Sequence, residues 1–322
     1  MMRFDRAAPG EGMIIYSRVE NGKAYLEFQF FLKENRGQAD TAEVAMEMEN
    51  YFAHICVYDM LCRLVLEIIY PLKEEELAKG MLLHPHVWRG VSDSYLYHVE
   101  VQLIDKRKGE LPVDVLERSF PLCSFQEIPG KGYFLNDEGF SLQAVLFHPL
   151  IQPKEAVSEQ ENQEIAKQEY LQKALQLLKD MGANTICVTE PVWEEEMFKV
   201  CDEMGLVVWY GRPDKDIPVV SELLAVQNTL PTEKYYYYKA CWSSEPFVYI
   251  LNNSLKRQEN GNYSLTVYSN QKKVALYAEG VLFEFQMSAP EFVFQEIPAK
   301  KYPLQLTVEA GECSVSVTFY DF

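Results

Sequence analysis

Residues 206–210 (Leu-Val-Val-Trp-Tyr) are the third apolar, strand-like run in an alternation of strands and helices. The alternation ends soon after this run. Two earlier apolar runs lead to His148-Pro149 and to Glu190-Pro191, and a helical pattern follows each of them. Such alternation predicts a parallel sheet. An eight-stranded (β/α) barrel needs about 200 residues or more, yet only about twenty separate Pro213 from the tyrosine run 235–238, where a strand-rich pattern begins. The sequence therefore predicts a barrel that stops at about three strands.

The limits of these elements follow from their apolar spacing and from glycine. We predict strands at residues 141–147, 184–189 and 206–210. Between the first two, an amphipathic stripe from Tyr170 to Met181 predicts a helix that Gly182 ends as a C-terminal cap. Three glutamates at 194–196 place acidic charge on the first turn of a second helix, which ends at Gly205.

The regions before and after this part have the short alternating runs of β-structure. Strands are predicted at residues 25–32, 41–49, 55–58, 63–69, 96–104 and 113–120, and after Tyr235 at 247–251, 263–269, 274–278, 283–285, 291–294, 304–308 and 314–320. The hairpin 133–140 leads into the parallel sheet. The expected fold is multidomain β and α/β: a β-sandwich over residues 1–121, a truncated barrel over 122–230 and a second sandwich over 231–322.

Composition limits the class of partner. The net charge of -18 argues against nucleic acid, which requires clustered basic residues. No apolar run is long enough for a signal peptide or a membrane span, so we expect a cytoplasmic protein without a membrane partner. The seven cysteines include no Cys-x-x-Cys pair and are interpreted as reduced, buried thiols. His54, His84, His86 and His98 lack metal-ligand spacing on a predicted helix, so neither a metal nor another cofactor is expected.

Several motifs resemble glycoside hydrolase family 2, the β-galactosidase and β-glucuronidase family. Residues 86–103 (from His-Val-Trp-Arg-Gly-Val to Glu-Val-Gln-Leu) resemble the last strands of its immunoglobulin-like sandwich. The hairpin at Phe134-Leu135-Asn136, residues 177–184 and residues 201–209 resemble the opening of its catalytic barrel, in order and spacing. Residues 236–242 and 267–277 resemble the immunoglobulin-like domain after the barrel. The resemblance implies that both sandwiches are immunoglobulin-like.

The departures from the family pattern fall where the family holds its sugar. The family has Leu-Arg-Gly-Val-Asn-Arg-His at the end of the first strand, and of its polar residues this chain keeps only the last, His148. After the second strand, the Arg and His of Arg-x-Ser-His-Tyr-Pro are replaced in Thr189-Glu190-Pro191. The Asp-Glu that follows the third strand is Tyr210-Gly211. The positions that would hold sugar hydroxyls are thus apolar or mismatched.

The catalytic pair of the family has no counterpart in this sequence. A retaining glycosidase needs two carboxyl groups about 5–5.5 Å apart, which the family supplies after barrel strands four and seven. No Asn-Glu dipeptide of the acid/base type occurs in the chain. We interpret the chain as a non-catalytic relative with a carbohydrate-binding or protein-interaction role. The alternative is an active, β-galactosidase-like glycosidase with relocated carboxylates, for which Glu190 and Asp214 are the candidates.

Several polar and aromatic residues remain as candidates for binding a carbohydrate. His148, Glu190 and Tyr210 follow the three strands, at the barrel face that carries chemistry, and Trp193 follows the second strand. Each could instead be a loop residue without a ligand. Trp88, Trp209 and Trp242 are further aromatic candidates, although aromatic runs such as residues 235–238 more often form cores and domain interfaces.

An unfinished barrel leaves two sheet edges and one inner face to cover. Val145, Phe147, Ile186, Val188, Val207 and Trp209 would line that face. We expect residues 217–226 to fold over one edge as a helix, because unpaired buried backbone groups are costly. The inner face is expected to meet a second copy in a homodimer, or to be shielded by the sandwiches of the same chain.

Overall fold

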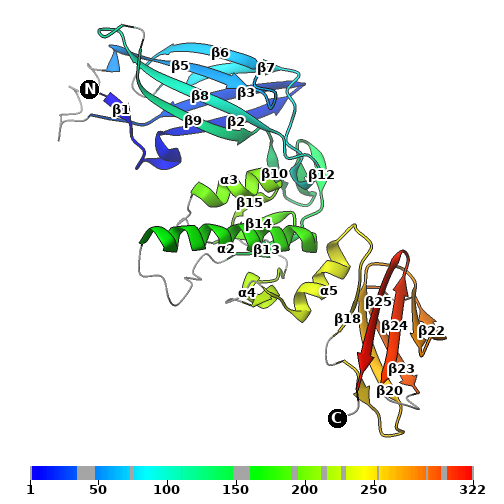
Figure 1. Cartoon of the computed structure of the whole chain (residues 1–322). Coiled ribbons are helices and arrows are strands. Elements are labelled where there is room, and N and C mark those ends of the chain that lie inside the picture. Colours follow the sequence, from blue (N-terminus) through cyan, green and yellow to red (C-terminus); the bar gives the residue numbers. More distant parts are fainter. Residues whose placement is uncertain are drawn as a thin grey trace. The chain divides into compact units, whose positions relative to one another are not determined.

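The computed structural model describes residues 2–34, 48–72, 76–109, 111–147, 160–189, 195–211, 216–225, 230–251, 254–287, 289–298 and 303–320. The protein is mostly β-structure in several sheets, with a few helices (Figure 1). The chain divides into two compact units. The first holds Met1–Leu142 and Trp193–Val207, and the second holds Gln143–Val192 and Val208–Phe322. The three-part division stays a prediction. Within the described residues, no helix is long and apolar enough to cross a membrane.

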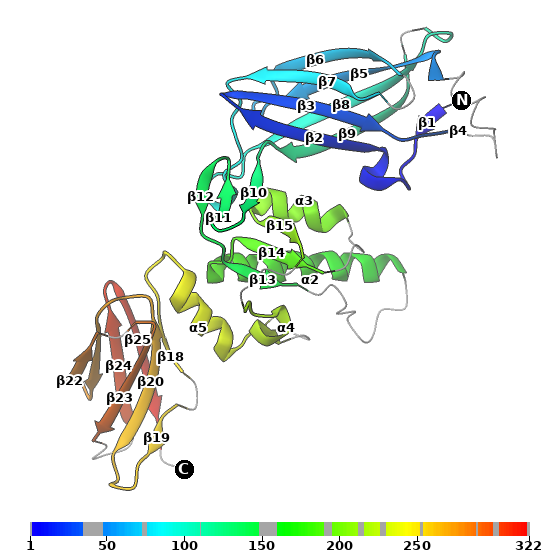
Figure 2. The ribbon, with the colours of Figure 1, turned by 180° about the vertical axis from the view of Figure 1, so that it is seen from behind.

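Two antiparallel sheets face each other in the first unit (Figure 2). One sheet has the order β2 (Met13–Glu20), β3 (Lys23–Phe30), β7 (Ala78–Leu83). The other has the order β6 (Leu64–Pro71), β5 (Tyr51–Tyr58), β8 (Leu96–Asp105), β9 (Pro112–Pro121). A short pair, β1 (Met2–Phe4) with β4 (Leu32–Glu34), lies beside them.

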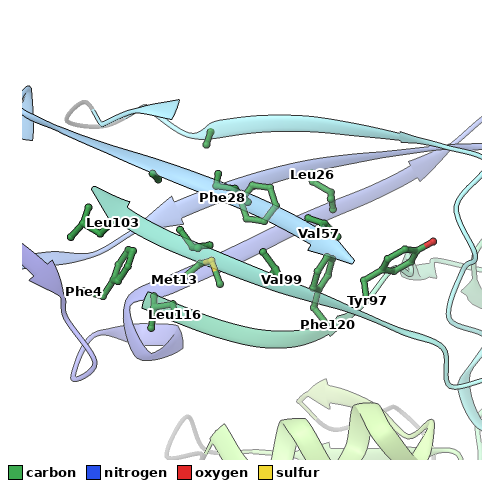
Figure 3. Close-up of a cluster of buried hydrophobic side chains, with 14 of the residues drawn as sticks. Phe4, Met13, Leu26, Phe28, Val57, Tyr97, Val99, Leu103, Leu116 and Phe120 are labelled. Atoms are coloured by element: carbon green, nitrogen blue, oxygen red, sulfur yellow. The ribbon is translucent and has the colours of Figure 1, made fainter. Parts of the chain in front are cut away.

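The core of this sandwich consists of the alternate side chains that each strand turns inward, as Figure 3 shows. On β5 these are Tyr51, Ala53, Ile55 and Val57, all fully buried. Strands β8 and β3 contribute Val99, Val101, Leu103, Leu26 and Phe28. Burying a Val, Leu, Ile or Phe side chain contributes about 1.5–3 kcal/mol. Because successive residues point to opposite faces, the same strands present every second side chain outward.

The strand predictions for this unit are confirmed in β3, β5, β6, β8 and β9. The sequence did not single out β2 and β7, since a small residue, Ser17 or Gly80, takes an inward position and interrupts the apolar alternation in each. The strand predicted at residues 41–49 falls almost wholly outside the described residues.

The predicted hairpin is present as β11 (Gly132–Leu135) and β12 (Glu138–Phe140), with β10 (Phe125–Ile128) on the other side of β11. Both turn residues, Asn136 and Asp137, have positive φ angles of 52° and 65°, as a two-residue hairpin turn requires. The Asn136 amide nitrogen donates to the Trp88 carbonyl (2.8 Å), and its amide oxygen accepts from the Ser124 N–H (2.9 Å). Asn136 therefore fastens the hairpin to the segment that leads into β8.

The indole of Trp88 joins helix α3 (Glu195–Met204) to the sandwich of the same unit. Trp88 is 2% exposed, and its Nε1–H donates to the Asp202 carbonyl at 3.0 Å. Leu135 and Val207 pack with it in one buried cluster. After the helix, Gly205 lies directly against the backbone of Gly90. Sequence segments more than a hundred residues apart are thus joined through one buried side chain.

A three-stranded sheet has the order β13 (Ala144–Leu146), β14 (Thr185–Val188), β15 (Val207–Tyr210). Strands β13 and β14 are parallel, as predicted, and helix α2 (Gln160–Met181) connects them. The apolar side of α2 is buried through Ala174, Leu175, Leu178 and Met181.

The inner face of this sheet is covered in the single chain. Five of the six side chains expected there (Val145, Phe147, Ile186, Val188 and Val207) are at most 6% exposed, and Trp209 is partly buried. The need for a second copy to cover them is therefore removed. The homodimer itself stays a prediction.

Backbone pairing protects the outer edge of β13. The Leu146 N–H donates to the Pro218 carbonyl at 2.9 Å, and Leu146 forms a parallel bridge with Val219. The helix expected over residues 217–226 is reduced to one turn, α4 (Val220–Leu223), followed by β16 (Leu224–Ala225) and its partner β17 (Leu230–Pro231). The edge is thus satisfied by hydrogen bonds, which buried strands require.

The tyrosine run lies in helix α5 (Glu233–Trp242), so the prediction that it begins the strand-rich region is wrong. Tyrosine favours strands, but Thr232 caps this helix by accepting a hydrogen bond from the Tyr235 N–H (3.4 Å), and packing engages its aromatic side chains. Tyr235 is buried, and Tyr236 stacks on Tyr249 with ring centroids 3.7 Å apart. Helix α5 therefore packs against the strands that follow it.

The last part of the second unit is the predicted pair of sheets. One contains β18 (Val248–Ile250), β20 (Tyr263–Ser269), β19 (Lys256–Arg257) and β23 (Glu291–Ile297). The other has the order β22 (Val281–Gln286), β21 (Val274–Ala278), β24 (Leu304–Ala310), β25 (Cys313–Phe319). Leu265, Val267, Phe292 and Phe294 from the first sheet meet Leu276, Leu306 and Val308 from the second in one buried cluster. All seven predicted strands of this region are confirmed.

The contact at Gly205 generates a stability prediction. A Cβ added to Gly205 would lie 2.6 Å from the Val91 nitrogen and closer still to the Gly90 carbonyl, and the φ angle of 82° disfavours other residues. Gly109 has a similar φ of 94° with nothing within 4 Å of such a Cβ. We expect Gly205→Ala to lower the free energy of unfolding by at least about 2 kcal/mol more than Gly109→Ala, as measured by denaturant unfolding. Equal losses would contradict the close packing of α3 on Gly90.

The carboxyl group of Asp202 gives a second prediction. Burial, with a smaller contribution from the charge of Glu203, raises the pKa of Asp202 from 3.8 to about 7 against the opposing effect of Arg118. Between pH 3.8 and about pH 7 the folded protein keeps a proton that the unfolded chain has lost. The contribution of Asp202 to stability therefore declines as pH rises. We therefore expect the free energy of unfolding of Asp202→Asn, relative to that of the wild type, to increase by on the order of 2 kcal/mol from pH 5 to pH 8. Thermal unfolding at both pH values measures it, with Glu127→Gln as the exposed control; a pH-independent difference would refute the raised pKa.

Candidate functional site

The candidate site predicted from the sequence is the edge of the sheet at which β13, β14 and β15 end. The structure places Phe147, Val188 and Tyr210 at these strand ends. His148, Glu190, Trp193 and Asp214 lie outside the described residues, so the structure does not bring them together or separate them. Of the predicted site residues, Tyr210 is the one that lies within the described residues.

Tyr210 is an exposed aromatic residue on a fixed strand end. Tyr210 is 51% exposed. The next residue, Gly211, donates its N–H to the Val188 carbonyl at 2.8 Å. That bond holds the end of β15 beside β14. Partial burial raises the pKa of the Tyr210 hydroxyl above its ordinary value, so the hydroxyl keeps its proton at neutral pH and can donate a hydrogen bond.

The neighbouring strand offers no reactive thiol. Cys187 on β14 is fully buried, and burial raises its pKa to about 11. A thiol with such a pKa stays protonated at neutral pH and is a poor nucleophile. Among the described residues at these three strand ends, Thr189 is the polar side chain beside apolar and aromatic ones, and none is a carboxylate. These side chains can stack on a ligand or donate a hydrogen bond to it, but they provide no group for acid–base chemistry.

The tryptophans proposed as sugar contacts differ in accessibility. Trp88 is buried, and its indole N–H is taken by the Asp202 carbonyl, so the prediction that Trp88 contacts a sugar is wrong. Trp209 and Trp242 are partly buried, and Trp242 packs against Tyr238 with ring centroids 4.7 Å apart. Indole burial depends on which segments meet in space, and the local sequence around Trp88 carries no signal of it.

The first unit contains a cleft of about 440 Å³ that sequence reasoning missed. Its walls are the β2–β3 turn at residues 19–22, the segment around Arg89 and Ser92, and the β11–β12 hairpin. Arg89 lies 4.0 Å from Glu138 across it, and Glu20 and Asp137 add two further acidic groups. These charges disfavour an anionic ligand. The sequence predicts the β11–β12 hairpin, but only the fold places it beside the β2–β3 turn.

Asp202 also has a pKa perturbed in the way that catalytic carboxyl groups have. It does not line the cleft, and its backbone carbonyl accepts from buried Trp88. We assign Asp202 a structural role in joining α3 to the sandwich.

The sequence has limited similarity to characterised proteins. No protein-family model matches the chain. A β-glucuronidase of Bacteroides fragilis is 24% identical over 136 residues, which are 41% of this chain and 18% of that protein.

Solved structures show a broader similarity. An FMN-binding β-glucuronidase from Facaelibacterium prausnitzii L2-6 matches 99% of this chain with a TM-score of 0.76 and 13% identity, over 75% of its own chain. A putative β-galactosidase from Bacteroides fragilis matches with a TM-score of 0.73, also at 13% identity and over 75% of its chain. For Bacteroides uniformis β-glucuronidase 2 the TM-score is 0.69, the identity 13% and the covered share 62%.

At these identities the similarity concerns the fold. It extends over almost the whole of this chain and over only part of each enzyme. The protein is therefore structurally similar, over its whole length, to a part of the β-glucuronidases and β-galactosidases of glycoside hydrolase family 2.

Proposed function

We propose that this chain is a non-catalytic relative of the family 2 glycosidases and that it binds carbohydrate at the strand ends of its parallel sheet. The observation that carries the proposal is the exposed ring of Tyr210 at the end of β15, where the resemblance places sugar-contacting polar residues. An aromatic ring at such a position offers a flat apolar surface beside a hydroxyl donor.

The internal spacing of the chain supports the loss of catalysis. Between the end of β15 at Tyr210 and the start of α5 at Glu233, the described residues form α4 and the short pair β16–β17. The family's acid/base and nucleophile follow barrel strands four and seven. Each of these barrel strands is followed by its own helix, and such a unit is longer than the short pair β16–β17. Retaining hydrolysis needs both carboxyl groups about 5–5.5 Å apart. One carboxylate such as Glu190 does not suffice.

The immediate surroundings support a binding role for Tyr210. Trp209 precedes it on β15 and is partly buried, so a ligand that contacts the strand end alters the environment of an indole. Binding sites are generally apolar surfaces with a few oriented polar groups. The described strand ends provide that combination.

The catalytic part of the proposal is tested with a panel of nitrophenyl glycosides that includes galactosides and glucuronides. We expect no release of nitrophenol above that of a heat-denatured control, because the second carboxylate is missing. Turnover that Glu190→Gln abolishes would overturn the proposal in favour of an active glycosidase with relocated carboxylates.

The binding part is tested by calorimetry and by tryptophan fluorescence, with galactosides, glucuronides and polysaccharides as ligands. We expect at least one sugar to give saturable heat, and Tyr210→Ala to weaken it by about tenfold through loss of ring stacking. Tyr16→Ala is the matched control, since Tyr16 on β2 is 47% exposed and lies in the first unit. No heat with any sugar, or equal effects of both variants, would exclude a carbohydrate site at Tyr210.

A further inference from the structure

The outer face of the sheet β6-β5-β8-β9 carries a cluster of side chains with metal-binding chemistry. On β5, the buried side chains of Ala53, Ile55 and Val57 turn inward, so His54 and Cys56 turn outward. They are two residues apart on one face. The Cys56 sulfur is 3.4 Å from the His54 Nε2.

Strand register adds a carboxylate to this pair. On one side of β5, Glu67 of β6 is the direct partner of Cys56. Its Oε1 lies 2.8 Å from the His54 Nε2. The nitrogen, sulfur and carboxylate oxygen of the three side chains all lie within 4.8 Å of one another. No motif in the sequence connects Glu67 with His54, because only the pairing of β5 with β6 aligns them.

The same row of the sheet accumulates negative charge. On the other side of β5, Glu100 of β8 is the direct partner of Cys56, and Glu117 of β9 is the direct partner of Glu100. Like charges directly opposite each other destabilise a sheet. Three carboxylates therefore lie in register across four strands with a thiol between them, and a cation bound beside Cys56 would offset their repulsion.

We propose that His54, Cys56 and Glu67 bind a divalent cation of the zinc type on the outer face of the sandwich. Imidazole nitrogen, thiolate sulfur and carboxylate oxygen are the ligands that Zn²⁺ takes in proteins, whereas Ca²⁺ and Mg²⁺ prefer oxygen alone. Three protein ligands leave one coordination position for water or a further ligand. This site is independent of the proposed carbohydrate function, since it uses none of the residues at the strand ends.

The accessibility of the three side chains suits a site loaded from solvent. The Glu67 side chain is 54% exposed and that of His54 is 26% exposed, while Cys56 is 7% exposed at the base of the cluster. Without a cation, burial raises the pKa of the Cys56 thiol against the opposing effect of a hydrogen bond with Tyr58, and the charges of Glu67 and Glu100 raise it further. Cys56 alone is then a poor nucleophile.

The test uses Co²⁺ as a spectroscopic probe, titrated into the full chain under a non-chelating reductant. We expect a saturable thiolate-to-cobalt charge-transfer band at one equivalent, which Zn²⁺ removes by displacement. Cys56→Ser should abolish the band, and His54→Ala and Glu67→Gln should each weaken Co²⁺ binding by at least about tenfold. Glu67→Gln changes an exposed side chain, so it keeps the test valid if the Cys56 variant does not fold.

Matched controls separate this site from other thiols and imidazoles. Cys62→Ser and His84→Ala change exposed residues of the same unit and should leave the band and the affinity unchanged. The proposal is overturned if the wild type gives no saturable band, if the band survives in folded Cys56→Ser, or if Glu67→Gln binds Co²⁺ as tightly as the wild type.

Discussion

The buried indole of Trp88 is the interaction on which the organisation of the first unit depends. An indole N–H removed from water needs an acceptor, and here it is the Asp202 carbonyl in the last turns of α3. The carbonyl of the same tryptophan accepts from Asn136 in the β11–β12 turn. One residue, in the segment that leads into β8, thus joins a hairpin and a helix. The approach of Gly205 to the Gly90 backbone completes the junction, because no side chain separates the two segments.

The parallel sheet has three strands, and the outer edge of β13 has to be paired by another segment. An uncovered strand edge exposes backbone donors and acceptors that another chain can pair with. Here Leu146 pairs with Pro218 and Val219, so a two-residue segment takes the place of a neighbouring strand on β13. The side chains of β13 and β14 are buried on both faces, as is typical of parallel strands. A sheet of three strands can therefore be covered within one chain.

Enzymes with parallel barrels place their charged chemistry at the strand ends, and the described residues at the strand ends of this sheet include no charged side chain. The described strand ends present Phe147, Val188 and Tyr210, and the buried thiol of Cys187 is held neutral. The group with the most versatile ligand chemistry is instead on the outer face of the antiparallel sandwich, where His54, Cys56 and Glu67 converge. Among the described residues, this cluster is separate from the strand ends of the parallel sheet.

The sequence by itself determined the local elements, because their signals are local. Period-two alternation marked β8 and β9, Gly182 and Gly205 marked the ends of α2 and α3, and residues 133–140 marked a hairpin. Tertiary structure decided what depends on distant partners. The tyrosines of α5 form a helix because Tyr235 is buried and Tyr236 stacks on Tyr249, which overrides their strand propensity. Likewise, the sequence could not reveal that Trp88 would be buried or that Glu67 would face Cys56, since a contact across strands is set by register, and register is fixed only when the two sheets close over their common core.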